Sequence, residues 1–189
     1  MQRVLFFVVG YFLLLCIYGC KKPGCIGAAG EVQIVTRSLA SFDELLLADN
    51  INLVLIQAPE EKIIIEAPAN MIPNITSGVV GNKLSITNVG DCRWARDPKE
   101  KINVQLFFRD LKKLVYQGSG TITNIDTLRL DAFELATDEG AGDIELTVDN
   151  GYTGAYVFAD DNVSLILHGR TDLCFTYTSS RGRSDMSDF

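Results

Sequence analysis

Oxygen-bearing side chains recur in the second half of the chain, each directly before an apolar residue. The apolar positions are 122, 144, 163 and 186, so the steps are 22, 19 and 23 residues. In stacked strands such side chains lie about 4.8 Å apart, and a row of their oxygens is a candidate Ca²⁺ site. Calcium-binding nonapeptide repeats have a much shorter period, so we expect no metal and predict that these side chains cap backbone N–H groups at turns. The row consists of Thr121, Asp143, Asn162 and Asp185.

A catalytic site like that of β-helical polysaccharide lyases needs a base and a cation on one face. Charged residues are available, but nothing in their spacing brings them together. The one histidine, His168, has no Ser or Cys partner at a spacing that indicates nucleophilic catalysis. We therefore predict no enzyme, no catalytic residue and no cofactor, with a polysaccharide-processing enzyme as the weakest alternative. The charged candidates are Asp160, Asp161, Arg170, Arg181 and Arg183.

Aromatic residues offer a different chemistry, the stacking of rings against sugars. Core or rim packing is the more common role of aromatic residues in β proteins. A carbohydrate-binding module is therefore the alternative hypothesis, and it requires an exposed row of these side chains. The candidates are Trp94, Tyr116, Tyr152, Tyr156 and Tyr177.

The elements that position these residues are short strands separated by a repeated Gly-x-Gly phrase. Gly118-Ser119-Gly120 is followed by Gly140-Ala141-Gly142, and degenerate copies lie at 159–163 and 181–186. Similarity at this period is typical of stacked repeats. The glycines allow tight corners or close backbone approach, and no helix follows them to form a phosphate site. The fold class predicted is all-β, a right-handed β-solenoid or β-helix-like repeat of coils of about 20 residues.

The first half of the domain is also rich in strands and looks antiparallel over about 31–101, whereas 102–189 carries the repeats. Alternation predicts strands at 32–37, 42–47, 51–57 and 62–66. Pro73 makes 70–75 a connection, and Gly81-Asn82 predicts a hairpin turn between strands. No linker divides residues 31–189, so we predict one domain.

The N-terminus carries a targeting signal. Residues 4–17 are an apolar run of 14 residues after Arg3, which is too short to span a membrane and suits a secretory signal at 1–19. Ile17-Tyr18-Gly19-Cys20 resembles a bacterial lipobox, so Cys20 is expected to be lipidated at the start of a tether over 20–30. An ordinary secretory signal is the alternative. We expect an outer-membrane lipoprotein that faces the periplasm or the cell surface.

Charge and cysteine content limit the partners. The formal net charge is −7, and it becomes −8 without residues 1–19, so no nucleic acid is expected as a partner. Anionic headgroups would repel the chain, which leaves the lipid on Cys20 as the link to the membrane. We predict a Cys25–Cys92 disulfide, with Cys174 as a buried free thiol in an apolar strand.

The chain resembles the head GIN domain, a putative auto-transporter adhesin domain of bacterial lipoproteins, over about 31–189. The resemblance implies a β-solenoid-like fold, an adhesin-like role and no known catalytic activity. Cys92-Arg93-Trp94 is similar to a subgroup that pairs this cysteine with an early one. Family members continue beyond the position of Phe189, so we expect a missing C-terminal cap and self-association through that edge. The matching segments are 42–44, 49–57, 69–75, 83–86, 101–104, 118–120 and 140–144.

The sequence thus predicts a non-catalytic cell-envelope lipoprotein, an adhesin or envelope scaffold that presents a β-solenoid surface to an unknown protein or glycan partner.

Overall fold

The computed structural model describes residues 30–90 and 101–189. The predicted signal and lipidated Cys20, together with Cys25, Cys92 and Trp94, lie outside the described residues. The lipid anchor and the disulfide therefore stay predictions.

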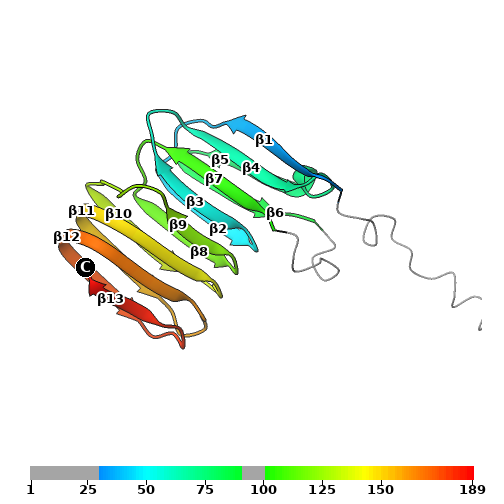
Figure 1. The fold of residues 1–189 in the computed structure, drawn as a ribbon. Coiled ribbons are helices and arrows are strands. Elements are labelled where there is room, and N and C mark those ends of the chain that lie inside the picture. The colour runs from blue at the N-terminus through cyan, green and yellow to red at the C-terminus, as the bar shows by residue number, and fades with distance from the viewer. Residues whose placement is uncertain (1–29, 91–100) are drawn as a thin grey trace, which may run out of the picture. The chain divides into compact units, whose positions relative to one another are not determined.

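The described part of the chain is all-β, as predicted, with thirteen strands and one short 3-10 helix, η1 (Figure 1). The hairpin expected at Gly81-Asn82 is confirmed, because β5 and β6 pair antiparallel on either side of it. The connection expected at 70–75 contains η1. The elements are β1 Val32–Ser38, β2 Glu44–Asp49, β3 Asn52–Gln57, β4 Lys62–Pro68, η1 Ile72–Asn74, β5 Ile75–Val80, β6 Lys83–Asn88, β7 Asn103–Phe108, β8 Lys113–Gly118, β9 Thr121–Asn124, β10 Ala132–Thr137, β11 Asp143–Val157, β12 Ser164–Thr178 and β13 Ser184–Asp188.

The strands form two stacks that share the long strands β11 and β12. One stack runs β1-β4-β7-β3-β9 and the other β5-β6-β2-β8-β10, and both end on β11. The first half of β11 pairs with β9 and its second half with β10. β12 follows β11 along its whole length, and β13 pairs only with Leu165–His168 of β12.

The expectation of an antiparallel first half is wrong for β2 and β3. β2 pairs parallel with β6 and β8, and β3 pairs parallel with β7 and β9. A corner joins the two strands at Asp49, which has a φ of 69°. Since this corner sends them into different stacks, they do not pair with each other. Among the described strands only β1/β4, β4/β7 and β5/β6 are antiparallel.

The core lies between the stacks and consists of equivalent apolar side chains from successive strands. In the second stack Leu45 pairs with Leu84 on one side and Leu114 on the other, and Leu114 pairs with Leu135. All four are fully buried, and burial of each such side chain contributes about 1.5–3 kcal/mol.

The register of the last two repeats differs from the one read from the sequence. Ile144 pairs with Ile122 as predicted, but its next neighbour is Leu165 rather than Val163, and Leu165 pairs with Ser184 rather than Met186. The first error is a slip of two residues, and the second is a slip of four, because Leu165 pairs with Ser184 over a step of 19 residues and not the predicted 23. Because side chains alternate with a period of two, such slips leave every residue on its own face, and the apolar pattern cannot detect them.

Two of the four residues in the predicted oxygen row are therefore displaced. Thr121 and Asp143 are neighbours, but Asp143 pairs next with Ser164, and Asp185 pairs with Ile166. Asn162 lies in the corner before β12. The row of four oxygens expected from the sequence does not form.

The Gly-x-Gly corners surround one buried tyrosine, Tyr116. Its hydroxyl donates to the backbone oxygen of Gly120 over 2.6 Å. A Cβ at Gly142 would overlap both this hydroxyl and the Gly120 oxygen, and a Cβ at Gly118 would overlap the Tyr116 ring and the Asp49 oxygen. The corners leave no room for a side chain at these positions. Elsewhere in the two phrases, a Cβ would meet the Ile51 backbone at Gly120 and the Val163 side chain at Gly140.

Side-chain amides extend the pairing where a strand stops. β9 ends at Asn124, whose amide nitrogen donates to the Thr147 oxygen (2.8 Å) while its oxygen accepts from the Thr147 N–H (2.9 Å). Gln57 forms the same two bonds with the backbone of Arg129, at 2.8 and 2.9 Å. Each amide takes the place of a peptide group. It pairs with a backbone donor and a backbone acceptor that have no strand partner because the adjacent strand has ended.

Candidate binding surface

The exposed aromatic side chains of the described residues gather on the outer side of the second halves of β11 and β12. Thr153, Ala155 and Val157 of β11 are buried, so the residues between them face outward. The register places Tyr152 beside Leu173, Gly154 beside Phe175 and Tyr156 beside Tyr177. We call this set, with Phe158, the aromatic surface. The exposed fractions are 63% for Leu173, 50% for Phe175, 49% for Tyr177 and 47% for Phe158.

The rings of the aromatic surface contact one another. The Tyr156 and Phe175 centroids are 5.5 Å apart, and those of Phe158 and Tyr177 are 5.9 Å apart, both tilted. These distances lie within the range of favourable aromatic pairs. The rings therefore support one another, while Phe158, Phe175 and Tyr177 remain about half exposed and available to a ligand.

Gly154 makes room for a tyrosine pair at the centre of this surface. A Cβ there would approach the Tyr152 hydroxyl and the Tyr156 ring to within 2.9 and 3.0 Å. The two hydroxyls lie 3.3 Å apart. Their hydrogen bond, followed by desolvation, raises the pKa of Tyr152 to about 12, so the Tyr152 hydroxyl is a neutral hydrogen-bonding group at physiological pH.

The prediction that Cys174 is buried is wrong. Cys174 is a free, exposed thiol, although it points to the same side of the sheet as the buried Thr153. No described strand lies beyond β12 at this point to cover it. Partial desolvation raises the pKa of the thiol, which favours the protonated form.

The structure separates the aromatic residues that the sequence grouped together. Tyr116 is fully buried, and burial raises the pKa of its hydroxyl, so it is a core residue and offers no surface to a sugar. Tyr152, Tyr156 and Tyr177 do come together. Sequence reasoning missed Phe158, Leu173 and Phe175, although apolar residues alternate with Cys and Thr over 173–178 as in a strand with one apolar face.

Three of the five charged residues considered for catalysis have structural partners. Asp161 is buried and accepts hydrogen bonds from the Thr137 hydroxyl, the Gly140 N–H (2.7 Å) and the Phe158 N–H (3.0 Å). Arg170 binds Asp149 over 2.9 Å, and Arg183 binds Asp185. Asp161 thus holds the corner before β12.

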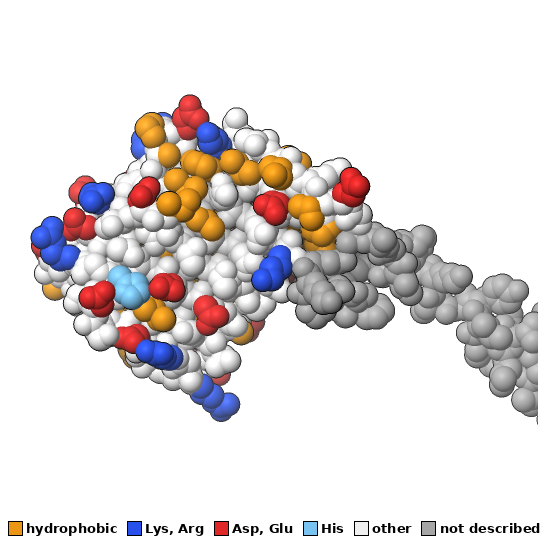
Figure 2. All heavy atoms as spheres, viewed as in Figure 1, with side chains coloured by type: hydrophobic (Ala, Val, Ile, Leu, Met, Phe, Trp, Pro, Cys, Tyr) orange, Lys and Arg blue, Asp and Glu red, His pale blue; other side chains and the backbone are white. Residues whose placement is uncertain are grey.

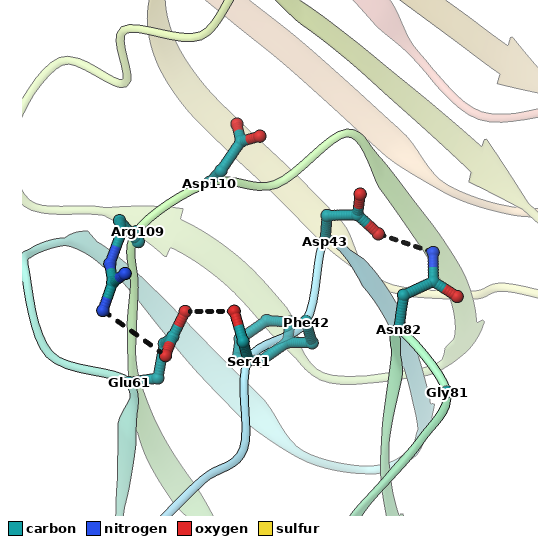
Figure 3. A pocket seen from close by; sticks show the side chains of 8 residues that line it. All are labelled: Ser41, Phe42, Asp43, Glu61, Gly81, Asn82, Arg109 and Asp110. Carbon is teal, nitrogen blue, oxygen red and sulfur yellow. Dashed lines mark hydrogen bonds and ion pairs between the residues drawn. The ribbon is translucent and has the colours of Figure 1, made fainter.

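A polar pocket of about 360 Å³, which the sequence did not indicate, opens beside the β5–β6 hairpin (Figure 3). Asp43 accepts from Asn82 at 2.6 Å and pairs with Lys112 at 2.8 Å. The Lys112 bond, then the Asn82 bond, lowers the pKa of Asp43. The polar groups largely satisfy one another. The lining residues are Ser41, Phe42, Asp43, Glu61, Gly81, Asn82, Arg109 and Asp110.

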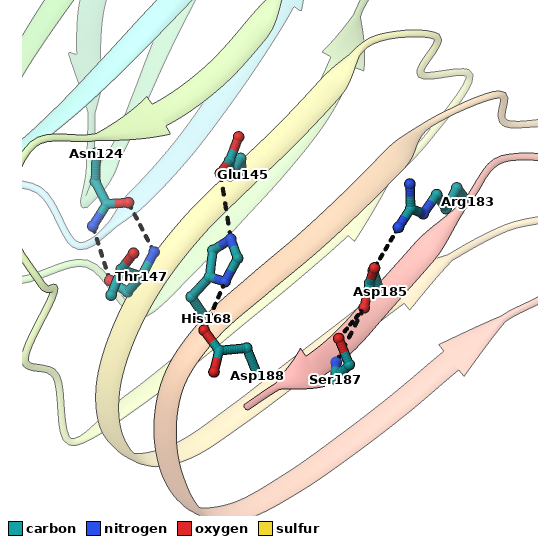
Figure 4. Close-up of polar contacts among 8 residues, drawn as sticks. All are labelled: Asn124, Glu145, Thr147, His168, Arg183, Asp185, Ser187 and Asp188. Atoms are coloured by element: carbon teal, nitrogen blue, oxygen red, sulfur yellow. Dashed lines mark hydrogen bonds and ion pairs between the residues drawn. The ribbon is translucent and has the colours of Figure 1, made fainter.

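The outer side of the first stack carries polar contacts at its β13 end. His168 lies between Glu145 (3.3 Å) and Asp188 (3.4 Å), and so links β11, β12 and β13 (Figure 4). Figure 2 shows this histidine flanked by acidic side chains, while hydrophobic side chains gather over β3, β4 and β7 at the other end. Among the described residues, no three His, Cys, Asp or Glu side chains gather as metal ligands do. No described helix has the length and apolar character needed to cross a membrane.

Comparisons with known proteins identify the relatives of this chain. Residues 41–189 match the family model described as "Putative auto-transporter adhesin, head GIN domain", which confirms the resemblance expected from the sequence. A putative adhesin from Bacteroides fragilis NCTC 9343 has a similar fold, with a TM-score of 0.61, 14% identity, and coverage of 82% of this chain and 78% of that one. A putative lipid binding protein from Parabacteroides distasonis ATCC 8503 has a TM-score of 0.60 and 13% identity, covering 84% and 75%. Among curated proteins, no sequence matches this chain.

Proposed function

Because the chain belongs to the head GIN domain family of putative auto-transporter adhesins, we propose that it is a non-catalytic lipoprotein of the bacterial cell envelope that binds a partner through its β-solenoid surface. The aromatic surface is the observation that supports this proposal most strongly. Exposed apolar patches of this kind mark interaction sites in soluble domains. Tyrosine and phenylalanine are also frequent anchors in binding interfaces.

The anchor proposed for this role is the lipid on Cys20, which would hold the domain at the outer membrane. Triacylation gives stable membrane attachment, since a single chain binds only reversibly. The acidic charge of the chain argues against attachment through anionic headgroups. Growth with labelled palmitate tests this: the wild-type chain should carry label in the membrane fraction, and Cys20→Ser should be unlabelled and released.

A carbohydrate ligand is the second candidate. Three of the tyrosines that this hypothesis requires do meet on one surface, and Tyr156 and Phe175 present adjoining rings. Sugars stack on aromatic faces while nearby hydroxyls form hydrogen bonds, and the Tyr152 and Tyr156 hydroxyls lie beside those rings. A protein anchor would use the same rings, so the ligand class is decided by experiment.

The test is a glycan array run in parallel with an envelope pull-down on the full-length chain. The double variant Phe175→Ser/Tyr177→Ser removes two exposed rings, and Val80→Ser is the matched control because Val80 is an exposed apolar residue on β5. We expect the double variant to weaken binding at least about tenfold and the control to leave it unchanged. Selective sugar binding identifies a glycan module, and a protein partner identifies an adhesin or scaffold. Equal binding by the double variant and wild type would show that the aromatic surface is not the site.

A further inference from the structure

The aromatic surface is one end of a longer row of apolar side chains on the outer side of the second stack. Because Leu45, Leu114 and Leu135 face the core, the residues next to them along each strand face outward. The register places one outward apolar residue of β2, β8, β10, β11 and β12 beside the next, on strands about 4.8 Å apart. We call this set the apolar row, which consists of Leu46, Val115, Ala136, Tyr156 and Tyr177.

The apolar row is continuous and accessible. Its first four members are half-buried, and Tyr177 is 49% exposed. Four steps between strands make the row about 19 Å long. The corresponding row on the first stack is interrupted, because Gln105 separates Ile64 from Val54, and Thr123 follows Val54. The continuous row is therefore a particular feature of the second stack and not a general property of these strands.

A ladder of alternating charges runs beside the apolar row. Its members occupy the preceding outward positions of β6, β2, β8 and β10, and each is the register neighbour of the next. Lys113 is exposed and the other three are half-buried, so the ladder offers hydrogen-bond donors and acceptors in turn along the row. In order across the sheet, the ladder consists of Lys83, Glu44, Lys113 and Glu134.

The other charges around the apolar row are mostly acidic. The ladder itself has no net charge, since it contains two lysines and two glutamates. Thirteen further charged residues of the described chain lie within these strands and the second halves of β11 and β12, or within three positions of their ends, and nine of them are acidic. This surplus disfavours an anionic ligand. The thirteen are Asp43, Asp49, Asp110, Lys112, Arg129, Asp131, Asp138, Glu139, Asp149, Asp160, Arg170, Asp172 and Arg181.

We propose that the apolar row binds an unbranched neutral glycan chain that lies across the strands, with the aromatic surface at one end. This inference rests on the proposed function, because the aromatic surface is the anchor of the chain. Sugar rings have apolar faces that stack on aromatic and apolar side chains. Their hydroxyl groups both donate and accept, which matches lysines and carboxylates in alternation. A linear chain of sugars repeats both features along its length, as the row and the ladder do.

A peptide strand fits the apolar row less well than a glycan does. The row lies on the face of a sheet, whereas peptides that add to sheets bind at an edge, where backbone groups find partners. An extended peptide across the face would place its N–H and C=O groups against apolar side chains without such partners. A glycan has no backbone amides that need to be paired in this way.

Isothermal titration calorimetry of the full-length chain in mild detergent tests the proposal. The probes are linear oligomers of glucose, mannose and N-acetylglucosamine with two or five residues, and oligogalacturonate is the anionic control. Val115→Asp places a charge in the middle of the row, away from the aromatic surface, and Val115→Ser is a milder second variant. Val54→Asp is the matched control, since Val54 is a half-buried outward valine of the first stack. Urea unfolding verifies that each variant folds.

We expect at least one neutral series to bind, with the five-residue chain at least about tenfold tighter than the two-residue chain, because a longer chain covers more of the row. Val115→Asp should weaken binding of the five-residue chain at least about tenfold, and Val115→Ser at least about threefold. The two-residue chain, which fits on the aromatic surface alone, should change by less than about twofold in both. Val54→Asp should leave both chains within about twofold of wild type.

The proposal is overturned if no neutral series binds, if chain length has no effect, or if oligogalacturonate binds as tightly as the neutral chains. It is also overturned if the Val115 variants bind the five-residue chain as the wild type does. Sugar binding that is independent of length but lost in Phe175→Ser/Tyr177→Ser overturns the role of the row and leaves the proposed function standing. A protein partner without any sugar binding has the same consequence. Sugar binding that this double variant retains contradicts the proposed function instead.

Discussion

The two ends of the stacks differ in how their terminal strands are tied together and covered. At the β1–β5 end, Arg37 points inward from β1 and donates to the Ile75 oxygen (2.7 Å) and the Ser77 hydroxyl (3.0 Å) of β5. The two stacks are thereby tied together over a buried core that includes Ile65 and Ile75. An inward charge at a sheet edge is also a known protection against strand addition.

At the β12–β13 end, no such side chain spans the stacks among the described residues. Met186 and Phe189 pack partly against the core, but the inward row at Cys174, Thr176 and Thr178 stays exposed. Among the described residues, a side chain ties the stacks together at the β1–β5 end, whereas one edge of the second half of β12 has no strand partner beside its exposed rings. Binding sites are often drawn from such less stable regions.

The largest expected difference between the ends concerns equivalent inward side chains. Ile65→Ala at the β1–β5 end should destabilise the chain by about 2–5 kcal/mol, because a fully buried isoleucine leaves a cavity. Thr176→Ala at the β12–β13 end should change stability by less than about 0.5 kcal/mol. Urea unfolding midpoints measure both. Similar losses in the two variants would show that the β12–β13 end is covered in solution.

A smaller difference in stability between the two ends is expected when a glycine is replaced by alanine. A Cβ at Gly182, before β13, would overlap the Val163 backbone oxygen, whereas at Gly78 on β5 it would meet open space. Gly182→Ala should displace β13, an end strand that can detach alone, and so cost about 1–3 kcal/mol; Gly78→Ala should be neutral or slightly stabilising. Hydrogen exchange of Ser184–Asp188 reports the detachment. Unchanged protection in Gly182→Ala would contradict the close approach.

The smallest effect concerns pH at the β12–β13 end. The Ser187 hydroxyl, the Ser187 N–H and then Arg183 lower the pKa of Asp185 from 3.8 to about 2. A carboxyl group whose pKa is lower in the folded state stabilises the fold at any pH above its pKa in the unfolded state. This stabilisation is lost as the pH falls through the pKa of the folded state. The contribution should therefore be complete above about pH 4 and disappear toward pH 2.

An NMR titration of the Ser187 amide measures this effect. Its resonance should move with a midpoint near the Asp185 pKa of about 2, and the Asp185→Asn variant should lack the transition. A midpoint close to 4 would show that the Asp185–Ser187 contacts do not persist in solution.

Local signals in the sequence were sufficient for the strands and for one hairpin. Alternation located β1, the apolar run Ile63-Ile64-Ile65 located β4, and Gly81-Asn82 located the β5–β6 turn, because turn chemistry depends on neighbouring residues alone. The family was also recognisable from the residues. Register was not predictable: Val163 and Leu165 have the same parity, so the apolar pattern fits both alignments and only stacking against Ile144 distinguishes them.

The candidate surface could be predicted only in part. Tyr152, Tyr156 and Tyr177 were named from composition, but nothing local distinguishes them from Tyr116, which the Gly-x-Gly corners enclose. Cys174 has the sequence context of a core residue and is exposed because no described strand follows β12 at that point. Burial depends on which elements lie opposite, and those elements are distant in the sequence.

By itself the sequence determined an all-β chain, the approximate strand positions in its first half and its family, since periodicity, turn residues and motif order are local properties. The tertiary structure alone decided that β2 and β3 enter different stacks, that Arg37 closes one end, and that aromatic residues from β11 and β12 share one exposed side. The physical reason is that parallel stacking joins residues about 20 positions apart. That pairing is set by how successive strands pack against one another, which no short segment encodes.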